Sequence, residues 1–334
     1  MLKSLRLQNY KRFRDLQFPA SQRVNLLTGK NNCGKTSVLE AILLLLGWKE
    51  SANEFAKVFR PGQGEHLGDE NEHFWKWLFP LRKLTELPRI SGDILQTGSY
   101  AVALRWQEGN TQQEPPSGMA DVHHGPIVVS VTAKVNPAHR QVEAVPTGHE
   151  VTSISAQPRS PSKEAQDYAR VTLKADGEEQ VEEMLRKLEP RLRAIRSLQP
   201  YGVPLLYAGI AGMPERIPII QLGHGFSRLL TIMAEIVASQ KPVVLIDEIE
   251  NGLHHSALVD IWRGLLTACE HSDVQIFATT HSWECVAAAH QAFSESLEYP
   301  LAVFRLEEKD GDIQAVVYDR ESLEYSVEKE WEVR

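Results

Sequence analysis

The chain has 334 residues, 42% of them hydrophobic, which is enough to bury the core of one large domain or two modest ones. A formal net charge of −8 excludes nucleic-acid binding over the whole surface, although a local basic patch remains compatible with it. The three cysteines have no CxxC spacing, which is typical of a reducing compartment and argues against a disulfide framework. The longest apolar run, AILLLLGW, is too short to span a membrane. We therefore expect a soluble, cytoplasmic protein.

The first elements form a strand–loop–helix unit. Alternating apolar and charged residues over 2–10 predict a strand and not a signal peptide. A second strand over 23–29 leads into a glycine-rich loop, and a helix follows from Lys35 to about Trp48. Residues 49–90 have a mixed pattern that predicts helix in part.

The middle of the chain is predicted to be rich in strands. Their apolar runs occupy residues 99–106, 126–135, 140–146 and 168–175. Polar, proline-bearing segments at about 108–125 and 146–166 are predicted to be loops.

One amphipathic helix is predicted over 177–197, and Pro190 kinks or splits it. Its apolar face comprises Val181, Met184, Leu185, Leu188, Leu192 and Ile195. Its polar side carries the best local candidates for DNA contact, Arg186, Lys187, Arg191, Arg193 and Arg196. A solvated helix face is the favoured interpretation over DNA contact, because such faces are usually charged.

The last third of the chain returns to alternating strands and helices. Short buried strands are predicted in PVVLIDE (242–248) and VQIFATTHS (274–282), each with a helix nearby, and a hairpin is predicted over 301–319. Strands that alternate with helices around a phosphate loop predict an α/β sheet.

The glycine-rich loop matches the pattern G-x-x-x-x-G-K-[ST] at every fixed position. With Ser37, the candidate phosphate site comprises Gly29, Lys30, Asn31, Asn32, Cys33, Gly34, Lys35, Thr36 and Ser37. Backbone N–H groups and the helix amino end bind phosphates, Lys35 reaches the β- and γ-phosphates of ATP, and Thr36 ligates Mg²⁺. A chance match is the alternative, but the strand before the loop and the helix after it favour function.

Polar residues follow both later buried strands. Asp247 and Glu248 end the first, where Asp247 would hold Mg²⁺ and Glu248 would take a proton from the attacking water. His281 follows the second and would sense the γ-phosphate. The alternatives are two solvated acids and a structural histidine.

Five strings occur in one order: NYKRF, VNLLTGKNNCGKTSVLEAI, QLGHGFSRLL, VLIDEIENGLHH and FATTHS. This order resembles the ABC-class ATPases of the OLD, RecF and SMC branch, and most closely the OLD-like prokaryotic ATP-binding proteins. The resemblance implies an α/β, ABC-type P-loop ATPase head with a β-rich N-terminal part and a helical insertion. It divides the chain into an N-terminal lobe at 1–90, an insertion at 91–200 and a C-terminal lobe at 201–334.

The resemblance also implies a homodimer that sandwiches ATP. The signature segment of one copy, Gly223, His224 and Gly225, would cap the nucleotide of the other, with Gly223 in place of the usual serine. Lys11 falls where relatives place a basic residue near the phosphates. Asn251, Leu253 and His254 fall in the D-loop at the dimer interface. The glutamine loop has no match that the sequence alone reveals.

Relatives of the OLD type continue into a TOPRIM nuclease domain, whereas this chain continues only about 50 residues past His281, too few for a domain of ordinary size. We therefore expect a Mg²⁺-dependent ATPase that controls DNA or a separate effector protein, such as a nuclease or toxin in antiviral defence or DNA repair. The alternative is an ATP-gated scaffold or inhibitor that holds a partner, with slow hydrolysis as a timer. A small-molecule kinase is disfavoured because nothing resembles an acceptor-substrate lid.

Overall fold

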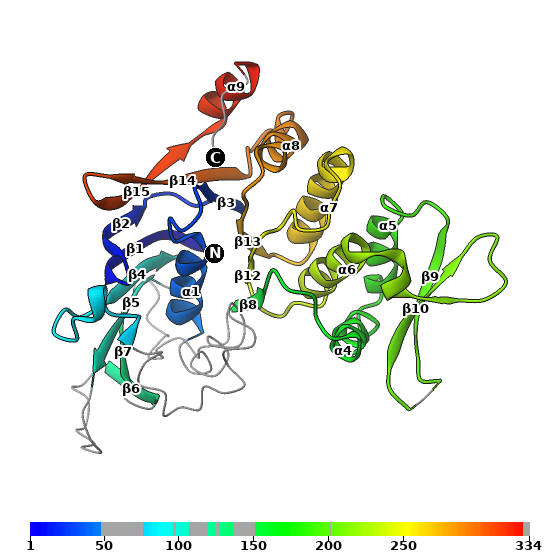
Figure 1. The fold of residues 1–334 in the computed structure, drawn as a ribbon, viewed down its shortest axis with the longest axis horizontal. Helices are drawn as coiled ribbons and strands as arrows, with labels where there is room; N and C mark the ends of the chain where they lie inside the picture. Colours follow the sequence, from blue (N-terminus) through cyan, green and yellow to red (C-terminus); the bar gives the residue numbers. More distant parts are fainter. Residues whose placement is uncertain are drawn as a thin grey trace.

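The computed structural model describes residues 1–47, 76–95, 98–106, 119–124, 127–135, 151–200 and 202–329. A lobe of strands around one helix lies on one side of a central sheet, and a lobe of helices lies on the other (Figure 1). Among the described residues, no helix is both long enough and apolar enough to cross a membrane.

The central sheet has the strand order β15-β14-β3-β13-β12-β8, in which β15 is an antiparallel edge strand and the other five are parallel. The strands are β3 (Val24–Gly29), β8 (Val151–Ile154), β12 (Val243–Ile246), β13 (Gln275–Thr279), β14 (Leu301–Lys309) and β15 (Asp312–Tyr318). Parallel strands need cover on both faces, which explains their continuous apolar runs. Along β12, Val243 and Leu245 join the core of the strand-rich lobe, while Val244 and Ile246 join the core of the helical lobe.

The strand-rich lobe is an antiparallel sheet with the order β2-β1-β4-β5-β7-β6. Its strands are β1 (Leu2–Tyr10), β2 (Phe13–Phe18), β4 (Arg89–Ile94), β5 (Gly98–Trp106), β6 (Met119–His124) and β7 (Ile127–Val135). Helix α1 (Lys35–Leu46) packs within this lobe and is buried on nearly every side, as its run of leucines predicts.

The helical lobe covers the other face of the central sheet. Its helices are α4 (Pro161–Val171), α5 (Gly177–Leu185), α6 (His224–Val237), α7 (Leu258–His271) and α8 (Trp283–Phe293), and α9 (Arg320–Glu328) packs on α8. A small sheet projects from this lobe, formed by β9 (Leu192–Leu198), β10 (Leu205–Ile210) and β11 (Ile217–Pro218) (Figure 1). Short 3₁₀ turns are η1 (Pro80–Arg82), η2 (Ile219–Leu222) and η3 (His255–Ala257).

The single helix predicted over 177–197 is wrong. Helix α5 ends at Leu185, and Leu192 begins strand β9. Pro190 disfavours helical torsions at the residue before it, and apolar spacing at the end of the segment fits a strand as well as a helix. Arg193 and Arg196 therefore lie on a strand, and no single helix face presents the five basic residues.

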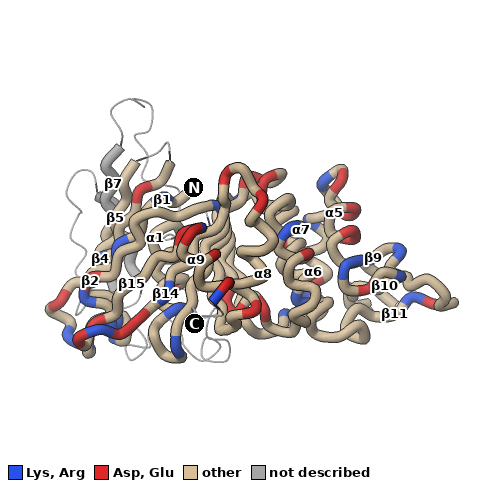
Figure 2. The backbone as a smooth tube through the Cα atoms, turned by 90° about the horizontal axis from the view of Figure 1, so that it is seen from above, with Lys and Arg blue, Asp and Glu red and all other residues tan. Residues whose placement is uncertain are grey.

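The basic residues of this region lie among acids, as Figure 2 shows for α5 and the β9–β11 sheet. Arg191 pairs with Glu189 at 3.0 Å, and Arg196 pairs with Glu178 at 3.3 Å. The five basic residues therefore do not form one basic helix face.

Two further predictions in the middle of the chain are wrong. The strand predicted at 168–175 is the end of α4 and the turn after it, because Ser160 caps the helix and Pro161 occupies its first turn. The segments predicted as loops contain β6, β8 and the start of α4. The strand predicted at 140–146 lies outside the described residues, whereas the strands at 99–106 and 126–135 and the hairpin at 301–319 are confirmed.

Candidate nucleotide-binding site

The phosphate loop joins β3 to α1, so that the amino end of α1 follows the carboxyl end of a buried strand. Gly34 has φ 96, and a Cβ there would lie 2.6 Å from the ring of Phe13, so only glycine fits. Asn32 has φ 64, the left-handed conformation that asparagine tolerates better than most residues. The loop therefore has a curled backbone with its N–H groups at a helix amino end.

The ammonium of Lys35 lies inside this loop. Its Nζ donates to the carbonyls of Gly29 at 2.8 Å and Lys30 at 3.0 Å. Burial lowers the pKa of Lys35, since the charged form loses hydration there. Phosphate oxygens at the loop would offset this loss, because they are charged acceptors.

Thr36 and Asp247 meet across the ends of two strands. Thr36 Oγ1 donates to Asp247 Oδ1 at 3.1 Å, and Thr279 Oγ1 donates to the same carboxylate oxygen at 2.7 Å. Adjacent oxygen ligands of an octahedral Mg²⁺ lie about 2.9 Å apart, given Mg–O distances of 2.0–2.1 Å. The hydroxyl and carboxylate therefore fit a Mg²⁺ ion in both type and spacing.

Glu248 lies next to this pair in a strained backbone conformation. Its φ is 49, and its N–H donates to Thr279 Oγ1 at 2.8 Å. The side chain is 43% exposed, and its Oε1 lies 4.0 Å from Nε2 of His281. The His281 N–H donates to Glu250 Oε1 at 2.7 Å. A carboxylate and an imidazole thus lie side by side at the open edge of the sheet.

The predicted residue Lys11 lies beside α1. Its Nζ is 3.5 Å from Ser37 Oγ and pairs with the carboxylate of Glu40. Sequence reasoning missed its neighbour Arg12, whose guanidinium donates to the carbonyl of Asn32 in the phosphate loop. The adjacent basic pair in NYKRF was the signal.

Gln157 also escaped the sequence analysis. It lies three residues past the end of β8, which pairs with β12 in parallel and so ends at the same sheet edge as Asp247. The carbonyl of Ala156 accepts from Asn251 Nδ2 at 3.1 Å, and that of Ser155 accepts from Arg228. The signal was only a four-residue strand, VTSI, shortly before a glutamine, and two of its four residues are polar.

Arg228 links α6 to the acidic strand end. Its Nη2 donates to the carbonyl of Asp247 at 2.5 Å and to that of Glu248 at 3.3 Å. Burial lowers the pKa of Arg228 to about 10, which still leaves it charged at neutral pH. A buried cation therefore holds the backbone beside both acids.

The segment Gly223–Gly225 starts α6 in the helical lobe, whereas the phosphate loop starts α1 in the other lobe (Figure 1). A Cβ on Gly225 would collide with the carbonyl of Gly252, so the start of α6 packs on the segment after Glu248. The structure thus brings Lys35, Thr36, Asp247, Glu248 and His281 together, and it groups Gly223–Gly225 with Gly252.

Two solved structures share this fold. One is an SMC head bound to the C-winged helix domain of ScpA, with a TM-score of 0.59 and 14% identity over 97% of this chain and 99% of that chain. The other is the SMC head domain from Thermotoga maritima, with a TM-score of 0.51 and 15% identity over 95% of this chain and 99% of that chain. The fold is therefore that of an ABC-type ATPase head, as predicted.

Sequence matches agree with this class. Residues 155–286 match the family described as "AAA domain, putative AbiEii toxin, Type IV TA system", and residues 1–75 match "AAA ATPase domain". An "ATP/GTP phosphatase" of Helicobacter pylori is 21% identical over 370 residues, 99% of each chain. The "DNA replication and repair protein RecF" of Clostridioides difficile is 36% identical over 66 residues, 20% of this chain and 16% of RecF. The chain is an ABC-type P-loop ATPase of the RecF, SMC and OLD kind.

Proposed function

We propose that the chain hydrolyses ATP with Mg²⁺ at the edge where β3, β12 and β13 end. The observation that carries this proposal is the 3.1 Å contact between Thr36 Oγ1 and Asp247 Oδ1, beside the strained Glu248. Bound Mg²⁺ would neutralise charge on the phosphates, and Thr36 and Asp247 would hold it.

The other side chains take separate roles in this proposal. The loop amides of residues 29–34 and Lys35 bind the phosphates. Glu248 accepts a proton from the attacking water, and His281 next to it contacts the γ-phosphate. Gln157 takes the glutamine-loop position, since β8 ends beside β12.

We further propose that two copies enclose two ATP molecules. Gly223 precedes the first turn of α6 and has no side chain to cap it, so the amides of that turn are suited to bind a phosphate of the other copy. Ile220, just before this segment, is 65% exposed, as expected of a residue that a second copy covers.

The output of this cycle passes to a second protein, and DNA is a further ligand to test. The resemblance to OLD-type enzymes motivates this part of the proposal, together with the matched family description that names a toxin system. DNA that stimulates turnover would support direct action on DNA. A partner protein that is retained only with ATP, without stimulated turnover, would instead support the scaffold alternative.

The direct test is ATP hydrolysis by the purified protein with and without Mg²⁺. Glu248→Gln should retain ATP binding and lower turnover by about 10²–10⁴-fold, the usual contribution of a general base. Lys35→Ala should weaken ATP binding itself. Wild-type turnover in Glu248→Gln would refute the assignment of the base.

A further inference from the structure

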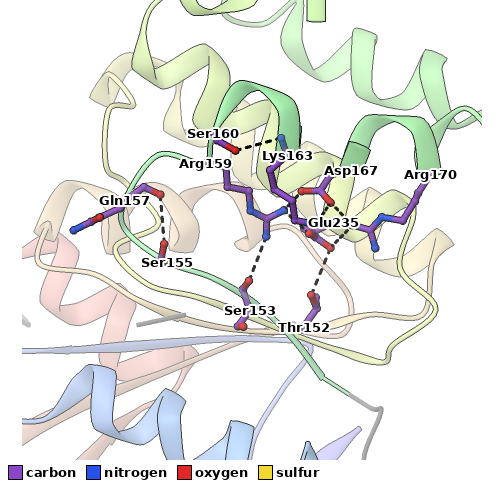
Figure 3. Close-up of polar contacts among 10 residues, drawn as sticks. All are labelled: Thr152, Ser153, Ser155, Gln157, Arg159, Ser160, Lys163, Asp167, Arg170 and Glu235. Carbon is purple, nitrogen blue, oxygen red and sulfur yellow. Dashed lines mark hydrogen bonds and ion pairs between the residues drawn. The ribbon is translucent and has the colours of Figure 1, made fainter. Parts of the chain in front are cut away.

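A buried ionic cluster lies next to the Gln157 segment and outside the nucleotide site. Arg159 pairs with Asp167 and Glu235, whose side chains are only 3% and 5% exposed (Figure 3). Arg159 Nη2 also donates to the carbonyl of Ser153 at 3.3 Å. One cation therefore binds two buried carboxylates and a strand carbonyl.

The cluster joins three elements. Arg159 lies two residues past Gln157 on the β8–α4 connection, Asp167 lies on α4, and Glu235 lies on α6. Thr152 of β8 is 3.5 Å from Glu235 through its hydroxyl. Because α6 begins at the signature segment, the same helix carries the segment proposed to cap the second ATP and an anchor for Arg159.

Gln157 is consequently held from both sides along the chain. Before it, Asn251 and Arg228 bind the carbonyls of Ala156 and Ser155. After it, Arg159 ties the backbone to α4 and α6. A shift of α6 relative to the central sheet must therefore move Gln157 or break a buried ion pair.

The energetics favour a positioning role over a purely stabilising one. A buried ion pair seldom stabilises a fold more than a well-packed apolar group, whereas loss of one partner leaves a costly unpaired charge. The planar guanidinium of Arg159 instead fixes the orientation of the groups that it binds, because its N–H donors lie in a rigid, forked arrangement.

We propose that Arg159, through Asp167 and Glu235, is a positioning residue that couples the orientation of α6 to the position of Gln157 at the ATP site. This inference rests on the proposed ATPase function. In this proposal, Arg159 contacts neither ATP nor the acidic pair Asp247 and Glu248. Its effect falls on turnover and leaves nucleotide affinity unchanged.

The test neutralises Arg159 and both buried carboxylates together, so that no buried group is left with an unpaired charge; Lys163 and Arg170, which also pair with these carboxylates, are half-exposed and can be solvated. In the triple variant Arg159→Met, Asp167→Asn and Glu235→Gln, the ATP Kd should stay at the wild-type value while kcat falls about 10- to 100-fold, as expected for a misplaced reacting group. Arg170→Met is the matched control. Arg170 contacts the same two carboxylates at 3.1 Å but lies on α4, away from the Gln157 segment, so its loss should leave kcat unchanged.

Hydrogen exchange provides a readout that does not depend on hydrolysis. Amides of residues 155–160 should exchange faster in the triple variant than in the wild type, while those of α1 stay protected. A folded triple variant with wild-type kcat, or with unchanged exchange at 155–160, overturns the proposal. If the wild type has no ATPase activity, or if Glu248→Gln does not abolish that activity, the proposed ATPase function is refuted. The hydrogen-exchange result then decides by itself whether Arg159 holds residues 155–160 in place.

Discussion

Thr36 and Asp247 lie 211 positions apart in the chain, yet their side-chain oxygens are 3.1 Å apart. Each follows a buried strand of one parallel sheet, and such strands end at a common edge. This pair defines where a divalent cation would bind.

Asp247→Asn should weaken Mg²⁺ binding and leave the fold intact. The amide oxygen can still accept from Thr36 and Thr279, but the negative charge is lost. We expect the Mg²⁺ concentration for half-maximal ATPase activity to rise at least about 10-fold. Asp260→Asn, on the exposed face of α7, is the control. An unchanged Mg²⁺ requirement in Asp247→Asn would refute the metal assignment.

Replacement of Glu248 by glycine should raise stability while abolishing turnover. Glutamate at φ 49 is strained by about 1–2 kcal/mol. Glycine relieves this strain at an entropic cost of about 0.5–1 kcal/mol, so the free energy of unfolding should rise by about 1 kcal/mol or less. Glu248→Ala removes the same carboxylate and keeps the strain, so it should lose turnover without this gain. Urea titration of both variants measures the difference, and equal stabilities would contradict the prediction.

Ile220→Glu should prevent ATP-dependent dimerisation and leave the monomer folded. The Ile220 side chain is 65% exposed near Gly223. A charge there should therefore change the stability of the monomer little, whereas it should strongly destabilise a dimer interface that covers this side chain. Sedimentation with ATP in a Glu248→Gln background should show dimers for the parent and monomers for the double variant. Leu297→Glu, a fully exposed site after α8, should still dimerise. If the Ile220→Glu variant dimerises with ATP as strongly as its parent, the surface around Ile220 is not the dimer interface.

Stability should depend on pH through Glu164. Burial raises the pKa of Glu164 to about 7. The negative charge of Asp167 adds to this rise, whereas the positive charge of Arg159 opposes it. A folded pKa above the unfolded value means that the native state binds the extra proton, so stability falls as pH rises from about 4.5 to 7 and then levels.

Glu164→Gln removes this titration. The difference in Tm between Glu164→Gln and the wild type should therefore grow in favour of the variant between pH 5 and pH 8. Glu189→Gln is the control, since the hydrogen bond from Arg191 lowers the pKa of Glu189 and confines its effect to more acidic pH. A difference for Glu164→Gln that is constant with pH would contradict the prediction.

Local patterns in the sequence were sufficient for the loop and for every strand of the central sheet except β8. Gly34 takes a positive φ, which its place in the loop motif predicts, and the continuous apolar runs of β12 and β13 follow from burial on both faces. Helix α1 and the β14–β15 hairpin were predicted for the same reason, because their signals lie within a few neighbouring residues.

Tertiary structure decided what depends on distant partners. Val151–Ile154 is too short to be recognised as a strand, and only its pairing with β12 brings Gln157 to the edge that holds Asp247. Arg159 is an ordinary polar residue in the sequence and becomes a partly buried cation because α4 and α6 present the buried carboxylates of Asp167 and Glu235 to it. The segment 177–197 has apolar spacing that suits a helix throughout, and its division at Pro190 into α5 and β9 depends on the strand β10 that pairs with its second half.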